Sequence, residues 1–374
     1  MKHRILALLI VLAMTLTLCA CGATATTTTT VAPETSEADS VEQEVEAVEG
    51  IEPMTLTAAI SFNETESGAL TMKWFCDYVT EATGGAITFD IYYGGTLCAR
   101  AEELEMLSSG AIDLAWLSTT LYQDQLPLMA FPQSGVNSIA DSMDVCKYML
   151  FENEETSELL YQEAYNNNFT YLGGLQAGTS QLCVSTVDIS SLEDMKPLKI
   201  GIAADGANLI ELGITNLIST NNGEGYENLS RGVCDAQNAA FAPAMNLRWY
   251  EVAPYFLLFN TYGAGNYFSM NLDTFNSLSP EVQAILEEAA IATMEQSVII
   301  VEDEFNASVE VLLENGGSMK SLSEEESELF YNVQMKINAD VCMARAVEQG
   351  MADDMYTILT DLAEYCGYEW DYEY

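Results

Sequence analysis

Histidine is nearly absent from this sequence: the only one in 374 residues is His3. Residues 1–20 have the pattern of a signal peptide, with a basic start at Lys2–Arg4 and an apolar run from Ile5 to Leu18. Removal of such a peptide would leave a chain without histidine. This absence excludes Ser-His-Asp and Cys-His nucleophiles and every metal site that contains histidine. We therefore expect no metal and no cofactor.

Basic residues are also scarce. The sequence has 12 Lys and Arg against 57 Asp and Glu, which gives a formal net charge of −45. A charge of this size repels nucleic acid and anionic lipid, so neither is expected as a partner. The 49% hydrophobic and 18% charged residues are nevertheless typical of a folded globular protein.

The nine cysteines show no zinc-binding spacing. Cys19 would leave with the signal peptide, and Cys21 follows it directly. The remaining seven are far apart and form no CxxC pair, so a zinc cluster is not expected. An odd number leaves at least one thiol unpaired within the chain, and we expect most of them to be buried as small apolar residues.

The end of the apolar run, Leu18-Cys19-Ala20-Cys21, resembles the lipobox of a bacterial lipoprotein. The resemblance implies cleavage before Cys21 and diacylation of its thiol, and two acyl chains would anchor the protein firmly to a membrane. The alternative is an ordinary secretory signal with incidental cysteines. Residues 21–53 are rich in Thr and Glu and almost free of aromatics, which predicts a flexible tether. No later segment has a long uncharged apolar run.

The folded part begins near Met54 with alternating strand and helix patterns. This succession predicts a β-α-β-α-β unit, in which helices cover a parallel sheet. The expected elements are a strand at Leu56–Ile60, a helix at Ala69–Ala82, a strand at Ile87–Tyr93, a helix at Glu102–Ser108 and a strand at Ile112–Leu117.

One short phrase occurs twice, as LSSGAIDLAW at Leu107–Trp116 and as LSRGVCDAQN at Leu229–Asn238. In each copy we expect a helix to end at the glycine and a strand to follow. The aspartates Asp113 and Asp235 would then lie at the strand entrance, where a carboxylate can accept backbone N–H groups. The alternative is a chance match between two α/β turns.

The sequence predicts further helices and strands before and after the second copy of the phrase. Residues Leu198–Ala203 predict a buried strand, and Ala207–Leu212 a helix. Ser279 and Pro280 have the pattern of a helix N-terminus, and helical spacing continues almost to the chain end. A break at Asn315–Gly317 interrupts it.

Together these stretches resemble the substrate-binding subunit of tripartite ATP-independent periplasmic (TRAP) transporters, the DctP-like family, from Met54 to about Tyr365. Each stretch is short, and their order and spacing carry the resemblance. They are Thr83–Gly85 with Gly94–Leu97 and Gly110–Asp113, then Leu192–Lys196 with Leu198–Ile200, then Glu224–Tyr226 with Gly232–Asp235, and finally Leu278–Glu281.

The resemblance implies an α/β fold of two lobes, of the type II periplasmic-binding-protein-like kind, with a long connecting helix. Lobe 1 would comprise residues 54–176 and 268–307, and lobe 2 residues 177–267 and 308–374. The family captures a small organic solute between the lobes on the extracytoplasmic side of the cell membrane. It then delivers the solute to TRAP permease membrane subunits that an ion gradient drives. The resemblance therefore implies a binding protein and no enzyme.

The sequence departs from the family at the arginines that hold a ligand carboxylate. The main one would follow Lys199-Ile200, where this chain has Gly201. A second would follow Gly178-Thr179, where it has Ser180. An aromatic of the family corresponds to Asn222 and an asparagine to Ala239, although Asn238 adjoins the latter position.

Two interpretations of these departures remain open. A charge-assisted hydrogen bond contributes roughly 1.5–3 kcal/mol, so losing both arginines argues against the usual grip on a monocarboxylate. The ligand could be neutral or cationic and contact the aromatic faces of Tyr93, Trp116 and Trp249. An anion could instead be held at Arg100, which follows a turn where the family places a ligand contact.

The residues at positions that correspond to the family's ligand contacts are distributed over most of the sequence. They are Ser61, Phe62, Arg100, Ser118, Ser180, Gly201, Asn222, Gln237, Asn238 and Ala239. We expect Trp116 to be a core residue. Two other functions share parts of this pattern: a sensory binding module for a membrane signalling partner, and a carboxylate-pair glycosidase, which the missing histidine does not exclude.

Overall fold

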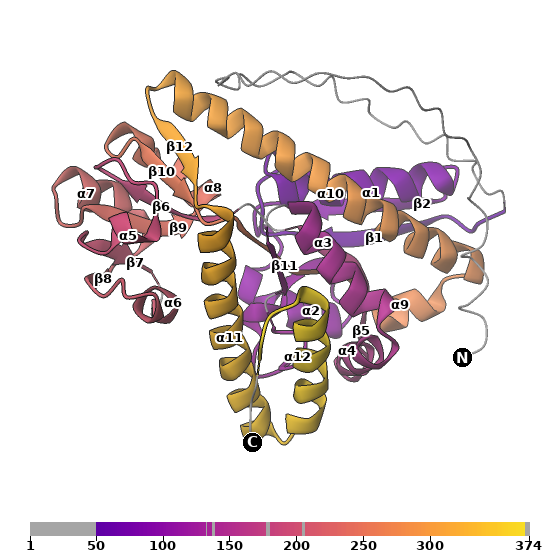
Figure 1. The fold of residues 1–374 in the computed structure, drawn as a ribbon. Coiled ribbons are helices and arrows are strands. Elements are labelled where there is room, and N and C mark those ends of the chain that lie inside the picture. The colour runs from indigo at the N-terminus through magenta and orange to yellow at the C-terminus, as the bar shows by residue number, and fades with distance from the viewer. Residues whose placement is uncertain (1–49, 132, 137–138, 177–179, 204–205, 371–374) are drawn as a thin grey trace, which may run out of the picture. The chain divides into compact units, whose positions relative to one another are not determined.

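The computed structural model describes residues 50–131, 133–136, 139–176, 180–203 and 206–370. The predicted signal peptide, the lipidation site Cys21, almost all of the predicted tether and the pair Gly178-Thr179 lie outside these residues. The described part is a mixed α/β structure with two sheets, which confirms the predicted fold class (Figure 1).

The first sheet has the strand order β2-β1-β3-β11-β4, and β5 also pairs with β11. Strands β1 and β2 are parallel, as are β1 and β3, so the predicted β-α-β-α-β unit is present. Strand β11 is antiparallel to β3, β4 and β5. The strands are β1 (Met54–Ala59), β2 (Ile87–Tyr92), β3 (Leu114–Ser118), β4 (Gln133–Val136), β5 (Phe169–Gln176) and β11 (Thr261–Asn271).

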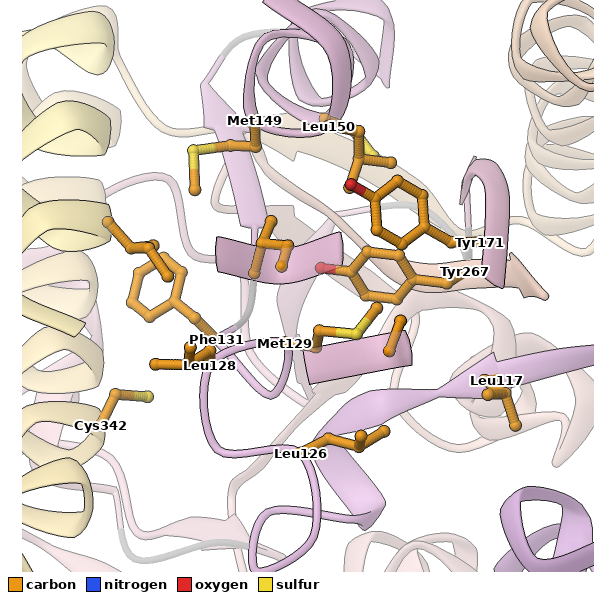
Figure 2. Close-up of a cluster of buried hydrophobic side chains, with 14 of the residues drawn as sticks. Leu117, Leu126, Leu128, Met129, Phe131, Met149, Leu150, Tyr171, Tyr267 and Cys342 are labelled. Carbon is orange, nitrogen blue, oxygen red and sulfur yellow. The ribbon is translucent and has the colours of Figure 1, made fainter. Parts of the chain in front are cut away.

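Helices pack on this sheet and enclose its core. They are α1 (Ser67–Ala82), α2 (Glu103–Ser108), α3 (Ile139–Lys147), α4 (Glu154–Asn166) and α9 (Leu272–Ser277), with a π-helical turn at Tyr148–Glu152 and 3-10 turns at Arg100–Glu102 and Thr119–Leu121. Figure 2 shows part of the core, where Leu117, Phe131 and Tyr267 pack with Cys342 from a C-terminal helix.

The second sheet has the order β12-β10-β6-β9-β7-β8. Its strands are β6 (Gln181–Ser185), β7 (Ile200–Ile202), β8 (Leu217–Ser219), β9 (Ala236–Ala240), β10 (Tyr255–Leu258) and β12 (Ser318–Ser321). Its helices are α5 (Leu192–Met195), α6 (Ala207–Glu211), α7 (Gly225–Ser230) and α8 (Phe241–Asn246), with 3-10 turns at Asn222–Glu224 and Trp249–Glu251.

Three helices complete the chain: α10 (Pro280–Glu314), α11 (Glu324–Gln349) and α12 (Ala352–Cys366). The long helix α10 starts as expected, because Val282 N–H donates to the Ser279 side chain at 3.4 Å. Its first half contributes Leu286 to the core of the first sheet, and its last turn contributes Leu312 to that of the second. One continuous helix thus belongs to both lobes.

The lobe boundaries expected from the sequence differ from the contacts in the structure at strand β11 and at helices α11 and α12. Residues 261–267 and 308–374 were assigned to lobe 2, whereas β11 pairs with β3 in the first sheet. Most buried side chains of α11 and α12, such as Met335 and Leu359, also pack in the core of the first sheet. The two helices lie side by side (Figure 1). Strand pairing therefore assigns β11 to lobe 1, and apolar contacts assign most of α11 and α12 to it as well. Both kinds of contact link segments that are distant in the sequence.

The repeated phrase has the structural role expected from it. Gly110 and Gly232 follow α2 and α7 with φ values of +74° and +66°, which glycine adopts without strain. The Asp113 carboxylate accepts the backbone N–H of Thr57 at 2.8 Å, and Asp235 accepts that of Lys199 at 2.9 Å. Each aspartate thus joins its turn to the neighbouring parallel strand.

Six of the seven cysteines in the described region are buried, as expected, and Cys366 is partly exposed. Within that same region, no helix has both the length and the apolar character required to cross a membrane.

Candidate ligand-binding site

Several of the predicted site residues fall into two clusters, one beside each sheet. The first is centred on Arg100, in the 3-10 turn before α2. Its guanidinium donates to the hydroxyl of Ser118 at the end of β3. Ser118 in turn donates to Asn266 Oδ1 on β11 at 2.5 Å. The structure thereby brings together Arg100 and Ser118, two of the predicted site residues, with Asn266, which the sequence analysis did not name.

The Phe62 ring provides a second contact for Arg100. The guanidinium carbon lies 5.6 Å from the ring centroid, within the range of a cation–π interaction. The ring packs edge-on against Trp116, with centroids 5.4 Å apart. A β-carbon on Gly68 would lie only 2.7 Å from Phe62 Cδ2, so the ring requires glycine at the start of α1.

Glu103 is a functional candidate that the sequence analysis did not name. Its side chain is buried, with 1% exposed, although it lies next to the exposed Arg100. Its Oε1 accepts a hydrogen bond from Ser61, and its Oε2 is buried without a partner. Burial raises the pKa of this carboxyl to about 7, against the opposing effects of the Ser61 hydrogen bond and the Arg100 charge.

Helical spacing was the signal that could have identified Glu103. Together with Leu104 and Leu107 it makes up the buried face of α2. A glutamate on the apolar face of a short helix is unusual, since a buried charge has a high desolvation cost.

The described region has ten basic residues, of which Arg100, Lys199 and Arg345 form no ion pair there. Seven of them form ion pairs with Asp or Glu side chains at 4 Å or less, which are Lys73, Lys147, Lys196, Arg231, Arg248, Lys320 and Lys336. Arg100 has no such pair with any described carboxylate. Its partners there are a hydroxyl and an aromatic ring.

The second cluster surrounds Gly201 on β7, which the sequence resemblance aligned with an arginine of the family. Gly201 is paired in register with Gln237 on the parallel strand β9. A β-carbon on Gly201 would lie 2.1 Å from Gln237 Oε1 and 3.1 Å from Thr220 Oγ1. Gln237 is fully buried, and its Nε2 donates to Thr220 Oγ1 at 2.8 Å. A glutamine side chain therefore occupies the space into which a side chain on residue 201 would extend.

The remaining predicted residues have separate surroundings. Ser180 is fully buried; its hydroxyl donates to the Gln181 backbone oxygen at 2.7 Å and accepts the N–H of Thr261 at 3.3 Å. Asn238 donates to the Leu182 backbone oxygen at 3.1 Å.

Two more predicted positions lie near the core of the second sheet. Ala239 is half-buried against that core. Asn222 is partly exposed, but its Oδ1 is buried without a partner. An unpaired buried acceptor leaves this side chain able to bind a donor group.

The aromatic residues considered as ligand contacts are mostly core residues. Trp116 is 1% exposed and Trp249 is fully buried, so their faces are covered by protein. Tyr93 is half-buried against the core of the first sheet. The prediction that Trp116 belongs to the core is confirmed.

Comparison with known proteins identifies the class that this fold and site define. The chain matches the DctP family, bacterial extracellular solute-binding protein family 7, over residues 59–342, and it belongs to that family. The family and the fold are those of transport proteins rather than enzymes.

Individual relatives are distant. The chain is 27% identical over 222 residues to the uncharacterized protein YiiZ of Salmonella typhimurium, a match that covers 58% of this chain and 66% of YiiZ. It is 23% identical over 273 residues to the C4-dicarboxylate-binding protein DctB of Bacillus subtilis, covering 71% and 75% of the two chains. A TRAP periplasmic solute-binding protein of a Sulfitobacter species, solved with bound β-D-galacturonate, has a TM-score of 0.60, 19% identity, and coverage of 82% and 100%.

Proposed function

We propose that this protein is a lipid-anchored extracytoplasmic receptor that captures a small organic ligand and delivers it to TRAP permease subunits. Membership of the family supports the capture role. Cys21 would carry the diacylglyceryl anchor, and the acidic segment after it would let the folded part move above the membrane surface.

The observation that carries the proposal is the pairing of Gly201 with Gln237. The buried Gln237 side chain lies where a side chain on residue 201 would begin, and its amide bonds to Thr220, so a neutral side chain fills this place. Ser180 at the second arginine position is likewise neutral. This supports a ligand grip that does not use the family's carboxylate–arginine pair in lobe 2.

The relatives suggest which compounds to test. The Sulfitobacter protein holds β-D-galacturonate, and DctB is named for C4-dicarboxylates. Both ligands are small organic acids. A test panel should combine such acids with their uncharged analogues and with small cations.

Ligand-dependent thermal stabilisation tests the function. A ligand at 100 times its Kd stabilises the folded protein by ~2.7 kcal/mol, which raises the melting temperature measurably. We expect at least one compound of a broad metabolite panel to do so. A panel without any stabilising compound would contradict the proposal.

The membrane anchor has its own test. Cells that express the full chain should incorporate a clickable fatty acid into it, and the Cys21→Ser variant should not. The variant should also leave the membrane fraction, whereas Cys19→Ser should remain there. Equal labelling of both variants would contradict an anchor at Cys21.

A further inference from the structure

We infer that the ligand of this receptor is an organic acid whose anionic group binds Arg100 in lobe 1, and that Glu103 takes up a proton when it binds. The inference rests on the proposed binding function and goes beyond it, because it assigns the charge of the ligand and a proton-linked residue.

Arg100 has a charge that no described carboxylate neutralises, a property it shares with Lys199 and Arg345. In a chain with 57 acidic side chains, seven basic residues of the described region are neutralised by carboxylates. Arg100 is exposed and has no ion pair with a described carboxylate. A guanidinium has five N–H donors, and its bond to Ser118 uses one terminal nitrogen. The others suit a carboxylate, which guanidinium binds in a bidentate manner.

The side chain of Arg100 is held in place before any ligand binds. Phe62 lies against its guanidinium, and Ser118 is itself fixed by the bond to Asn266 on a different strand. The Tyr122 hydroxyl also donates to the backbone oxygen of Arg100. Less conformational entropy is lost on binding when the charged group is immobilised beforehand.

Glu103 faces groups from several segments of the chain. Arg100 comes from the preceding turn, Ser61 from the segment after β1, and Tyr122 from the segment after β3. The charge of Glu103 also acts on the thiol of Cys98. Burial raises the pKa of the Tyr122 phenol to about 12 and raises that of the Cys98 thiol, so both are neutral near pH 7.

The neighbouring Glu102 is exposed, and its carboxylate accepts the N–H of Ala99 at 2.9 Å. Its charge is therefore solvated. Glu103 is the group of this cluster whose pKa lies near neutral pH.

The protonation state of Glu103 decides whether this site attracts an anion. With Glu103 ionised, the two residues have no net charge. With Glu103 protonated, Arg100 contributes a full positive charge. Because the pKa of the buried carboxyl is about 7, both states are populated at neutral pH. A bound anion favours the protonated state and thus draws in a proton.

This linkage gives a quantitative expectation. At pH 8, about nine tenths of a group with a pKa near 7 is ionised, so binding should take up nearly one proton per ligand. At pH 5.5 the carboxyl is already protonated and uptake should be close to zero. The Kd should rise about tenfold per pH unit above pH 7 and stay constant below pH 6.

Calorimetric titration with D-galacturonate, succinate and L-pyroglutamate tests the inference, in buffers of different ionisation enthalpy at pH 8.0 and pH 5.5. Among the acids that bind, we expect proton uptake at pH 8.0 in the natural protein and in Glu105→Gln, an exposed glutamate of the same helix. In Glu103→Gln the uptake should vanish and the Kd should become independent of pH. Arg100→Gln should weaken acid binding at least tenfold, and Arg100→Lys should weaken it less.

Two results would overturn this inference without contradicting the receptor function. One is proton uptake in Glu103→Gln equal to that of the natural protein. The other is stabilisation by uncharged or cationic compounds and by no acid, which would leave the receptor function intact. Absence of stabilisation by any compound of the broad panel would instead overturn the receptor function, and this inference with it.

Discussion

The Gln237 side chain lies over Gly201, so that a β-carbon on residue 201 would come within 2.1 Å of Gln237 Oε1. The two residues are in register on adjacent parallel strands. The glycine at position 201 and the buried glutamine therefore depend on each other: a larger residue at position 201 requires a different side chain at position 237.

This contact predicts that substitutions at positions 201 and 237 have strongly coupled effects on the free energy of unfolding. We expect Gly201→Ala to destabilise the protein by ~1–3 kcal/mol, because the added methyl group overpacks a buried site. In a Gln237→Ala background the same substitution should cost much less. Urea unfolding of the two single variants and the double variant measures the coupling. Additive effects would show that Gln237 can move aside freely.

Asp113 should contribute more to stability than Asp235. Asp113 accepts the Thr57 N–H at 2.8 Å and the Thr274 hydroxyl at 2.7 Å, whereas Asp235 accepts the Lys199 N–H at 2.9 Å and is exposed. Each unpaired buried donor costs ~1–3 kcal/mol.

Unfolding in urea should therefore show a larger loss for Asp113→Ala than for Asp235→Ala. Asp113→Asn should recover part of the loss, since its amide oxygen is still an acceptor. Ligand affinity should be unchanged in all three variants. A selective loss of affinity would instead assign Asp113 to the binding site.

Removing the Ser118 hydroxyl should weaken ligand binding, and it should also destabilise the free protein by ~1–3 kcal/mol because Asn266 Oδ1 is left buried without its donor. Ser118→Ala removes the acceptor that orients Arg100 and the donor to Asn266. A hydrogen bond to a charged group contributes ~1.5–3 kcal/mol, so the Kd should rise by roughly tenfold or more.

The Kd from titration calorimetry and the melting temperature of the free protein provide the two readouts. Ser109→Ala is the control, because its hydroxyl bonds only within the last turn of α2. Similar affinities of the two variants would exclude a role for Ser118 in holding Arg100.

Stability should fall as pH rises from about 5 to 8, in part because of Glu163. Its carboxylate is buried and accepts the N–H groups of Leu128 at 2.9 Å and Met129 at 2.7 Å. Burial outweighs these bonds and raises its pKa from 4.5 to about 7. A carboxyl with a higher pKa in the folded state binds more protons there. Its stabilising contribution is complete below pH 4.5 and is lost as pH passes 7.

The loss attributable to Glu163 is of the order of 3 kcal/mol. Glu163→Gln should be less stable at pH 5, since an amide cannot accept both N–H groups, but its stability should change less between pH 5 and pH 8. Urea unfolding at both pH values checks this, with the exposed Glu155→Gln on the same helix as control. An unchanged pH dependence in Glu163→Gln would contradict the assignment.

Local elements could be predicted from the sequence because their causes are local. Gly110 and Gly232 end helices through backbone conformations that few other residues adopt, and the aspartates three residues later bond to the adjacent strands. The Ser279–Pro280 start of α10 is equally a matter of a few neighbouring residues. The correspondence of Gly201 and Ser180 to arginine positions of the family stays a prediction from the sequence.

The tertiary structure alone decided which distant residues meet. Ser118 and Asn266 are 148 residues apart and meet because β11 inserts beside β3. The placement of α11 and α12 against the first core, the burial of Glu103 and the position of Gln237 over Gly201 likewise depend on strand pairing and apolar packing. Such contacts are set by the fit of whole surfaces, and no short stretch of sequence encodes them.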